Sequence, residues 1–394
     1  MKKLLIASAA LAMVAGTAQA QSSVTVYGSY DLGYNNLSVK NFEGAENTAA
    51  QRNIAGINQA TAGGALTSNR IGFRGTEDLG GGLKANFNLE YGFSNNIVGD
   101  TVTTTVPVTT AATTTADGAL SQTSSAIQTR TSRVGLESAT LGRLDVGYGL
   151  TGLFATVTGH SPLPGNNFIG DVAYTDNSAS AADSRILLGA VRANGLQYTS
   201  PTMGGFTARI DAGTNTTLSD SAAATNVRAT NNGLTVNYAG GPLQLAATVH
   251  QLRTDTSIAS NVVSKTDFQA FSARYAVSSN LAVNALYATN KTTSGADVQS
   301  SKNDVTQVGV SYLMGKTQLV AQYGEGEGVG TSSTNNVRDR KGYQVGAIYN
   351  LSKRTNAYAI YGSQEQKYQT AQTNGSAGTV EKISGYTVGL RHSF

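Results

Sequence analysis

Apolar and polar residues alternate along much of this chain with a period of two. The clearest segment is Leu83–Phe93, where Leu, Ala, Phe, Leu, Tyr and Phe take every second position and Lys84, Asn86, Asn88 and Glu90 lie between them. This period predicts a β-strand with one apolar and one polar face. After residue 20 the chain contains no run of about 18 apolar residues, which excludes membrane-spanning helices.

Similar alternation recurs to the end of the chain. With the weaker segments included, it predicts sixteen strands, centred near residues 28, 71, 88, 132, 146, 195, 209, 235, 247, 271, 285, 309, 320, 345, 359 and 388. Short connections between these strands alternate with long ones. The long connections are expected at Asn35–Thr67, Ser94–Ile127, Leu150–Gly189, Asn215–Asn231, Thr254–Lys265, Asn290–Asn303, Gly324–Arg340 and Ser363–Glu381.

Alternating short and long connections are typical of a transmembrane β-barrel with short periplasmic turns and long extracellular loops. A water-filled lumen needs about sixteen strands, because about eight strands leave an interior that side chains fill. We therefore expect an all-β fold, a sixteen-stranded antiparallel transmembrane barrel with lipid outside and water inside.

Residues 1–20 have the order of a secretory signal peptide. The positive Met1–Lys3 precedes an apolar run over Leu4–Gly16, and small residues follow at Ala18–Ala20. We expect cleavage after Ala20, which leaves one barrel domain over residues 21–394. A retained anchor is the alternative.

Composition agrees with an exported strand-rich protein. The chain has 45 Gly, 18 Tyr, 5 Pro and no Cys, so disulfides and thiolate metal sites are excluded. The formal net charge of +4 falls by two when Lys2 and Lys3 leave with the signal peptide. This small charge gives no reason to expect a nucleic-acid partner.

Alternation also assigns charged side chains to the lumen. Ile71 and Phe73 take the lipid-facing positions of their strand, so Arg70 must face water, since a charge facing lipid costs about 2–4 kcal/mol near the midplane. The other side chains expected to face the lumen are Tyr27, Asp31, Arg74, Lys84, Glu90 and Arg209.

Four strings resemble the Gram-negative trimeric general-diffusion porins, and in particular their anion-preferring branch. They are SSVTVYGSYDLG (Ser22–Gly33), SNRIGFRGTEDLGGGLKANFNLEYGF (Ser68–Phe93), LQYTSPTMGGF (Leu196–Phe206) and GYTVGLRHSF (Gly385–Phe394). The resemblance implies an outer-membrane homotrimer without a cofactor, through which small hydrophilic solutes and inorganic ions diffuse. It also implies that the third long loop, residues 150–189, folds into the barrel and narrows it.

The resemblance further implies a constriction lined by arginines. It places them at Arg70, at Arg130 and at Arg192. Two positions depart from the pattern. Arg133 lies on the opposite face from Arg130, and alternation does not decide which of them points inward. Arg192 has the parity of a lipid-facing residue, so either a β-bulge corrects it or Arg185 or a loop residue takes its place.

Acidic residues of the third loop are expected to oppose these arginines. The first acid of the loop is Asp171, and the segment Pro162–Asn167 has none. Because little negative charge opposes the arginines, we expect a weak to moderate anion preference.

The chain end has its own implied role. By resemblance, Tyr386, Val388, Leu390 and the terminal Phe394 form the signal that the outer-membrane assembly machinery reads. A lipid-facing aromatic at the interface is the plainer interpretation of Phe394, and both can hold.

Two other functions are less consistent with the sequence. An outer-membrane barrel enzyme finds little support, because His160, His250 and His392 are scattered without a paired Ser and acid, and they offer no metal site. Gly147–Gly152 matches G-x-G-x-x-G, but neither an amphipathic helix nor a second parallel strand is expected after it. A substrate-specific channel would need a row of lumen aromatics, and only Tyr27 faces inward.

Overall fold

The computed structural model describes residues 23–42, 52–57, 64–93, 104–105, 119–120, 127–165, 168–173, 191–217, 226–257, 262–295, 298–330, 337–368 and 380–394. The expected signal peptide over residues 1–20 lies outside the described residues, and so does Arg185. Across the described ranges, no helix is long and apolar enough to cross a membrane.

Sixteen strands of the described chain form a closed antiparallel barrel, as the alternation predicts. They are β1 (Ser23–Phe42), β3 (Arg70–Gly80), β4 (Leu83–Phe93), β7 (Ile127–Ser138), β8 (Gly142–Leu150), β9 (Arg192–Thr199), β10 (Phe206–Thr217), β11 (Asn226–Gly240), β12 (Leu243–Ser257), β13 (Val262–Ala276), β14 (Leu281–Ser294), β15 (Val298–Met314), β16 (Thr317–Gly330), β17 (Val337–Asn350), β18 (Thr355–Tyr368) and β19 (Val380–Ser393). Every predicted strand centre falls inside one of them.

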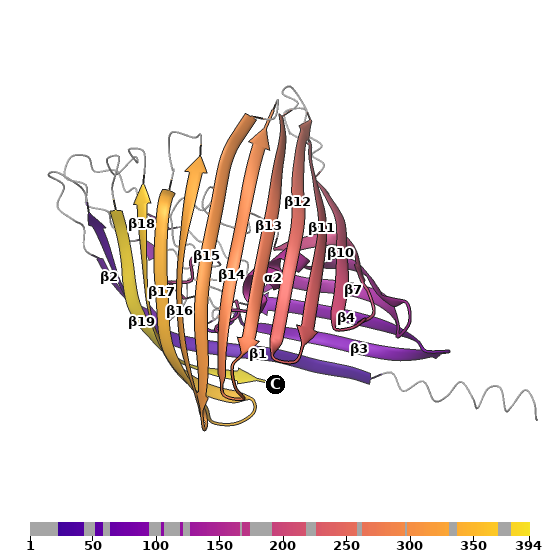
Figure 1. Ribbon diagram of the computed structural model, residues 1–394, viewed down its shortest axis with the longest axis horizontal. Helices are drawn as coiled ribbons and strands as arrows, with labels where there is room; N and C mark the ends of the chain where they lie inside the picture. Colours follow the sequence, from indigo (N-terminus) through magenta and orange to yellow (C-terminus); the bar gives the residue numbers. More distant parts are fainter. Residues whose placement is uncertain are drawn as a thin grey trace, which may run out of the picture.

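Three short strands complete the described sheet structure. β2 (Arg52–Ile57) pairs with the extracellular half of β1, over Tyr34–Val39. β5 (Thr104–Thr105) and β6 (Ala119–Leu120) pair with each other. In Figure 1, β12–β15 stand steeply across the front of the barrel, and β3, β4 and β7 run at a much shallower angle.

The barrel closes on β1, which pairs with a different strand along each half of its length. Ser23–Ser29 pairs with β3, and Ser29–Phe42 pairs with β19. The main chains of Gly28 and Phe394 exchange both hydrogen bonds, at 3.1 and 3.2 Å. The last residue of the chain is therefore fixed beside the first strand (Figure 1).

The strands are longer than alternation predicts, and the loops are correspondingly shorter. The connection expected at Asn215–Asn231 begins only after Thr217 and ends before Asn226, and β15 and β16 also extend into their expected loops. Above the membrane both faces of a strand meet water, so the apolar alternation disappears while the main-chain ladder continues.

The outer face of the barrel carries the apolar side chains. On β14–β19 they form an exposed band, with tyrosines at its upper edge. These tyrosines are Tyr287, Tyr323, Tyr343, Tyr361 and Tyr386. Aromatic girdles of this kind mark the interface between lipid and water.

The loop between β8 and β9 folds into the barrel, as expected. It opens with a short helix, α2 (Gly152–Gly159), which was not predicted and whose N-terminus is capped by the hydroxyl of Thr151. Asp211 on β10 accepts a hydrogen bond from the Gly152 amide at 2.8 Å, where a negative charge is favoured by the helix dipole. Thr156 bonds Thr248 on β12 at 2.6 Å, which ties the helix to the wall.

Beyond α2 the loop follows the inner wall from β13 to β18. His160 bonds Ser272 of β13 at 2.8 Å, and burial, then the charge of Arg274, lowers the pKa of His160. Gln344 on β17 donates to the carbonyl oxygens of Phe168 and Ile169, both at 2.8 Å. Inward-facing glycines give the loop room on four successive strands: Gly309, Gly324, Gly342 and Gly362.

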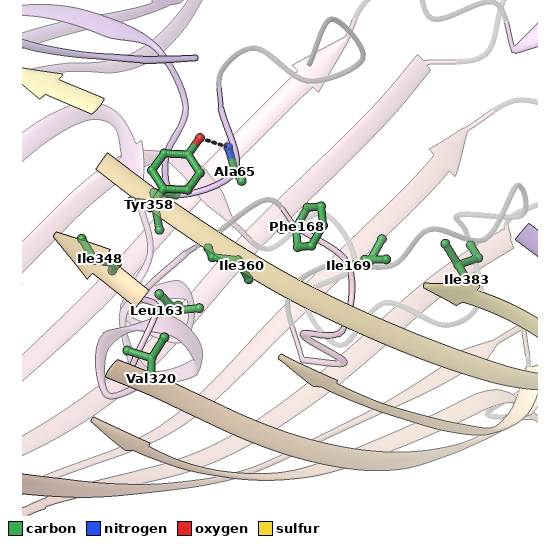
Figure 2. Close-up of a cluster of buried hydrophobic side chains, with 10 residues drawn as sticks. Ala65, Leu163, Phe168, Ile169, Val320, Ile348, Tyr358, Ile360 and Ile383 are labelled. Atoms are coloured by element: carbon green, nitrogen blue, oxygen red, sulfur yellow. Dashed lines mark hydrogen bonds between the residues drawn. The ribbon is translucent and has the colours of Figure 1, made fainter. Parts of the chain in front are cut away.

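A second segment also lies inside the barrel, and the pattern of alternation did not predict it. Residues 64–67, here called the strap, cover Asp31, whose carboxylate accepts hydrogen bonds from the amides of Leu66 and Thr67 and from the Tyr358 hydroxyl. Figure 2 shows Ala65 of the strap bonded to Tyr358 in the same apolar cluster as Phe168 and other loop residues. The strap and the far end of the loop therefore share one packed core.

Close packing of the loop on the wall generates a prediction. A Cβ on Gly362 would lie 2.1 Å from the carbonyl oxygen of Ile169, so Gly362→Ala should lower the free energy of unfolding by about 1–3 kcal/mol through overpacking. Gly159→Ala is the matched control, because nothing lies within 4 Å of a Cβ there. Thermal unfolding followed by circular dichroism in detergent measures both. Equal stability of the two variants would contradict close packing at Gly362.

Candidate pore constriction

Charged side chains gather on the inner wall of β1, β3, β4 and β7. Glu90 accepts a hydrogen bond from Arg130 Nε at 2.7 Å, and Arg70 Nε lies 3.8 Å from its other oxygen. The Tyr27 hydroxyl also donates to Glu90, at 3.1 Å, and Arg74 lies over the Tyr27 ring at 5.0 Å. One carboxylate is thus shared by two guanidinium groups, which leaves one positive charge in excess.

A β-bulge settles the choice between Arg130 and Arg133. On β7, Thr131 stands opposite Glu90 and Thr129 stands opposite Tyr91, so Arg130 is an extra residue in the ladder. The expectation that the two arginines take opposite faces was wrong, because one inserted residue reverses the parity beyond it. Both side chains point into the barrel.

Arg133 and Arg209 form a second cluster, where the loop leaves the wall. Each guanidinium donates to the carbonyl oxygen of Leu150, the last residue of β8. Arg209 also pairs with Asp211 at 2.9 Å, and Gln197 donates to the same carboxylate at 2.7 Å. This network fixes the first turn of the loop to β7, β9 and β10 at once.

Arg192 is the first residue of β9 and contacts the main chain of Arg130. It stands opposite Leu150 in an uninterrupted ladder with β8, so it keeps the outer-face parity of Leu196 and Tyr198. No bulge corrects that parity within β9. Its Nε donates to the main-chain oxygen of Arg130 at 3.0 Å, which fixes the guanidinium to the edge of β7.

Asp171, the loop acid expected to oppose the arginines, is withdrawn from the lumen. Asp171 is 2% exposed and accepts hydrogen bonds from the Ala173 amide and from Gln322 of β16. Asp31 lies inside the barrel, as expected, but is fully covered by the strap. In the described part of the loop, residues 150–165 and 168–173, Asp171 is the one acid.

In the ion pairs that Glu90, Asp145 and Asp211 form on this wall, the arginine is more exposed than its carboxylate. Glu137, which pairs with Arg143 near the periplasmic turn, is the exception, at 44% against 38%. The side-chain exposures are 32% for Arg70 against 15% for Glu90, and 18% for Arg209 against 5% for Asp211. Arg143 and Asp145 show the same order, at 38% and 7%. At Glu90, Asp145 and Asp211 a solute in the lumen therefore meets the guanidinium group first, with the carboxylate behind it.

The remaining predicted residues lie closer to the chain ends or to the turns. Arg74 and Lys84 are exposed on the inner face, and Lys84 stands opposite Glu137 near the periplasmic turn. Tyr386, Val388, Leu390 and Phe394 are exposed on the outer face of β19 and at its end. Their role as an insertion signal stays a prediction.

The histidines of the described chain have structural hydrogen-bond partners. Ser272, the partner of His160, is 1% exposed and so is closed to solutes. His250 is buried and bonded to Asn231, and His392 bonds Thr355. Among the described residues no group of three or more His, Asp or Glu side chains is placed to hold a metal ion.

Comparisons with known proteins agree with this geometry. The family model described as Gram-negative porin matches residues 7–369. An outer membrane porin of Bordetella pertussis is 29% identical over 431 residues that span all of both chains.

Two solved structures share the fold. The anion-selective porin from Comamonas acidovorans has a TM-score of 0.66 at 23% identity, over 95% of this chain and all of that one. OmpT of Vibrio cholerae in a trimer form has a TM-score of 0.59 at 14% identity, over 95% and 99% of the two chains. With a family match over most of its length and a closed barrel with a charged inner wall, this chain belongs to the Gram-negative porin family and is an outer-membrane diffusion channel.

Proposed function

We propose that this porin passes small hydrophilic solutes and inorganic ions by passive diffusion with a weak to moderate preference for anions, and that it has no catalytic activity. The observation that carries the proposal is that, in the ion pairs with Glu90, Asp145 and Asp211, the arginine is more exposed to the lumen than the carboxylate. A positive wall raises the local concentration of anions in a narrow aqueous passage. The anion-selective name of the Comamonas acidovorans structure is consistent with it.

The preference should be weak because most charges on the wall are paired. Arg70 and Arg130 share Glu90, and Arg209 is paired with Asp211. Arginine stays charged at every physiological pH, so the preference should also be insensitive to pH. We assign the constriction to Arg70, Arg130 and Arg133. Arg209 lies where the β8–β9 loop begins, and we place Arg192 and Asp171 outside the constriction.

We further propose that three copies of the chain assemble through the outer face of β7–β11. Two adjoining hollows of about 400 and 470 Å³ lie there and share Asn194. Polar outward side chains line them: Thr129, Ser132, Thr214, Thr230 and Asn232. Exposed hydroxyl and amide groups are poorly solvated by lipid, so a protein neighbour is the better partner. The trimer form of the OmpT structure supports the same stoichiometry.

The role of Arg70 is tested by removing its charge. Arg70→Ser should lower the chloride-to-potassium permeability ratio about twofold, the effect expected of one charge acting across several ångströms of water. Arg253→Ser is the control, since Arg253 pairs with Asp255 on the outer face of β12. The reversal potential of single channels in planar bilayers under a KCl gradient gives the ratio. An unchanged value for Arg70→Ser would remove Arg70 from the constriction.

Removing the carboxylate charge of Glu90 should change the anion preference in the opposite direction. Glu90→Gln leaves Arg70 and Arg130 without their carboxylate, so the anion preference should rise by about the same factor. Glu365→Gln makes the same change of charge in the ion pair with Lys341, on the outward parity of β18, and should be silent. The same bilayer recording compares them. A fall in anion preference for Glu90→Gln would contradict the proposed role of this wall.

The proposed trimer contact is tested by steric bulk. Asn194→Trp fills the hollow that Asn194 lines and should reduce the mass of the detergent-solubilised complex from three chains to one. Tyr343→Trp, on the far outer face at β17, should leave the complex intact. Size-exclusion chromatography with light scattering measures both masses. A trimer that persists in Asn194→Trp would place the contact elsewhere on the barrel.

A further inference from the structure

Charged side chains form a row along the inner wall, from Arg130 through Glu90 to Arg70, and closure of the barrel extends this row onto β1 and β19. Arg70 on β3 stands opposite Ser29 on β1, and two residues further along β1 Asp31 stands opposite Arg391 on β19. Arg391 has the inward parity of its strand, because Val388 and Leu390 alternate on the outer face. The row therefore runs over five neighbouring strands, from Arg130 through Glu90 and Arg70 to Arg391.

Arg391 differs from the other arginines of this row in its partners. In the described part of the chain, no ion pair joins Arg391 to a carboxylate. Its Nε is buried and has no hydrogen-bond partner there, and the same holds for Ser29 Oγ and Asn356 Oδ1 on the flanking strands. Asn356 stands directly opposite Arg391 in the ladder with β18.

Asp31 is the nearest candidate to neutralise this charge, but its carboxylate is engaged elsewhere. One oxygen accepts the amides of Leu66 and Thr67, at 2.9 and 2.8 Å, and the other accepts the Tyr358 hydroxyl at 2.7 Å. Asp31 is fully covered, whereas Arg391 is partly exposed. The acid therefore holds the strap, and the guanidinium remains beside the lumen.

The count of charge along the row shows what Arg391 adds. Arg70 and Arg130 are positive and Glu90 and Asp31 are negative, so these four side chains sum to zero. Arg391 gives the row its net positive charge. We propose that Arg391 is a selectivity-determining residue, which together with Arg70 attracts small inorganic anions such as chloride to this side of the pore.

The inference rests on the proposed anion preference, and bilayer recording separates the two. Arg391→Gln should lower the chloride-to-potassium permeability ratio about twofold at low ionic strength. The difference from the unaltered porin should vanish near 1 M KCl, where the Debye length falls to about 3 Å. Arg391→Lys keeps the charge and should retain most of the preference. Arg253→Gln, outside the lumen, should leave the ratio unchanged.

A second variant guards against misfolding of the first. Asn356→Asp places a carboxylate opposite an intact Arg391 and should lower the ratio to a similar extent. Circular dichroism and the mass of the complex establish that each variant is assembled. If Arg391→Gln does not assemble, the permeability ratio of Asn356→Asp provides the test. The inference is overturned if the assembled variants match the unaltered porin while Arg70→Ser shifts the ratio. If the unaltered porin itself shows no anion preference, the proposed function fails instead.

Discussion

The pairing of β1 with both β3 and β19 is the interaction on which the rest of this molecule depends. Lipid supplies no hydrogen-bond partners, so a sheet in a membrane must close on itself. β1 closes it by pairing with β3 over Ser23–Ser29 and with β19 over Ser29–Phe42. Because the two ends of the chain meet there, Arg70 from the second barrel strand and Arg391 from the last become neighbours on one wall.

Closure also brings the β8–β9 loop and the strap into contact inside the barrel. The β8–β9 loop runs along β10–β18, and the strap lies on the seam formed by β1, β18 and β19. Their side chains meet in one apolar cluster around Tyr358 and Phe168 (Figure 2). Arg70 and Arg130 are not part of this apolar cluster and keep 32% and 18% of their side chains exposed. Arg70 also donates to the Thr67 hydroxyl of the strap at 3.2 Å. Packing on one side of the barrel thus determines where the charged passage lies.

The fold was largely predictable from sequence, because lipid outside and water inside impose a period of two on every strand. The inward direction of Arg70, Tyr27 and Glu90 followed from that period. The side of Arg133 did not, since a single extra residue at Arg130 reverses the parity and no residue type marks the bulge. Loop lengths were overestimated because the strands continue above the membrane, where neither face is selected to be apolar.

Contacts between residues far apart in the sequence account for the other differences between the predicted and the observed positions of charged residues. Asp31 has the parity of a lumen residue, but the strap that covers it comes from a loop whose path alternation does not describe. Gln322 holds the Asp171 carboxylate against β16, and no spacing along the sequence indicates that contact. Arg391 lies within a string associated with membrane insertion, and that association says nothing about a role in the lumen. Its alternation already placed it inward, and only the register with Asp31 revealed its neighbours.

The proposed ion preference depends on arginines that are more exposed than the carboxylates of Glu90, Asp145 and Asp211. The most direct test is the reversal potential of the unaltered porin in a KCl gradient, measured over a series of ionic strengths. We expect a chloride-to-potassium permeability ratio above one at low salt that declines toward one as the Debye length shrinks from about 10 Å to about 3 Å. A ratio below one at low salt, or one that does not change with ionic strength, would contradict it.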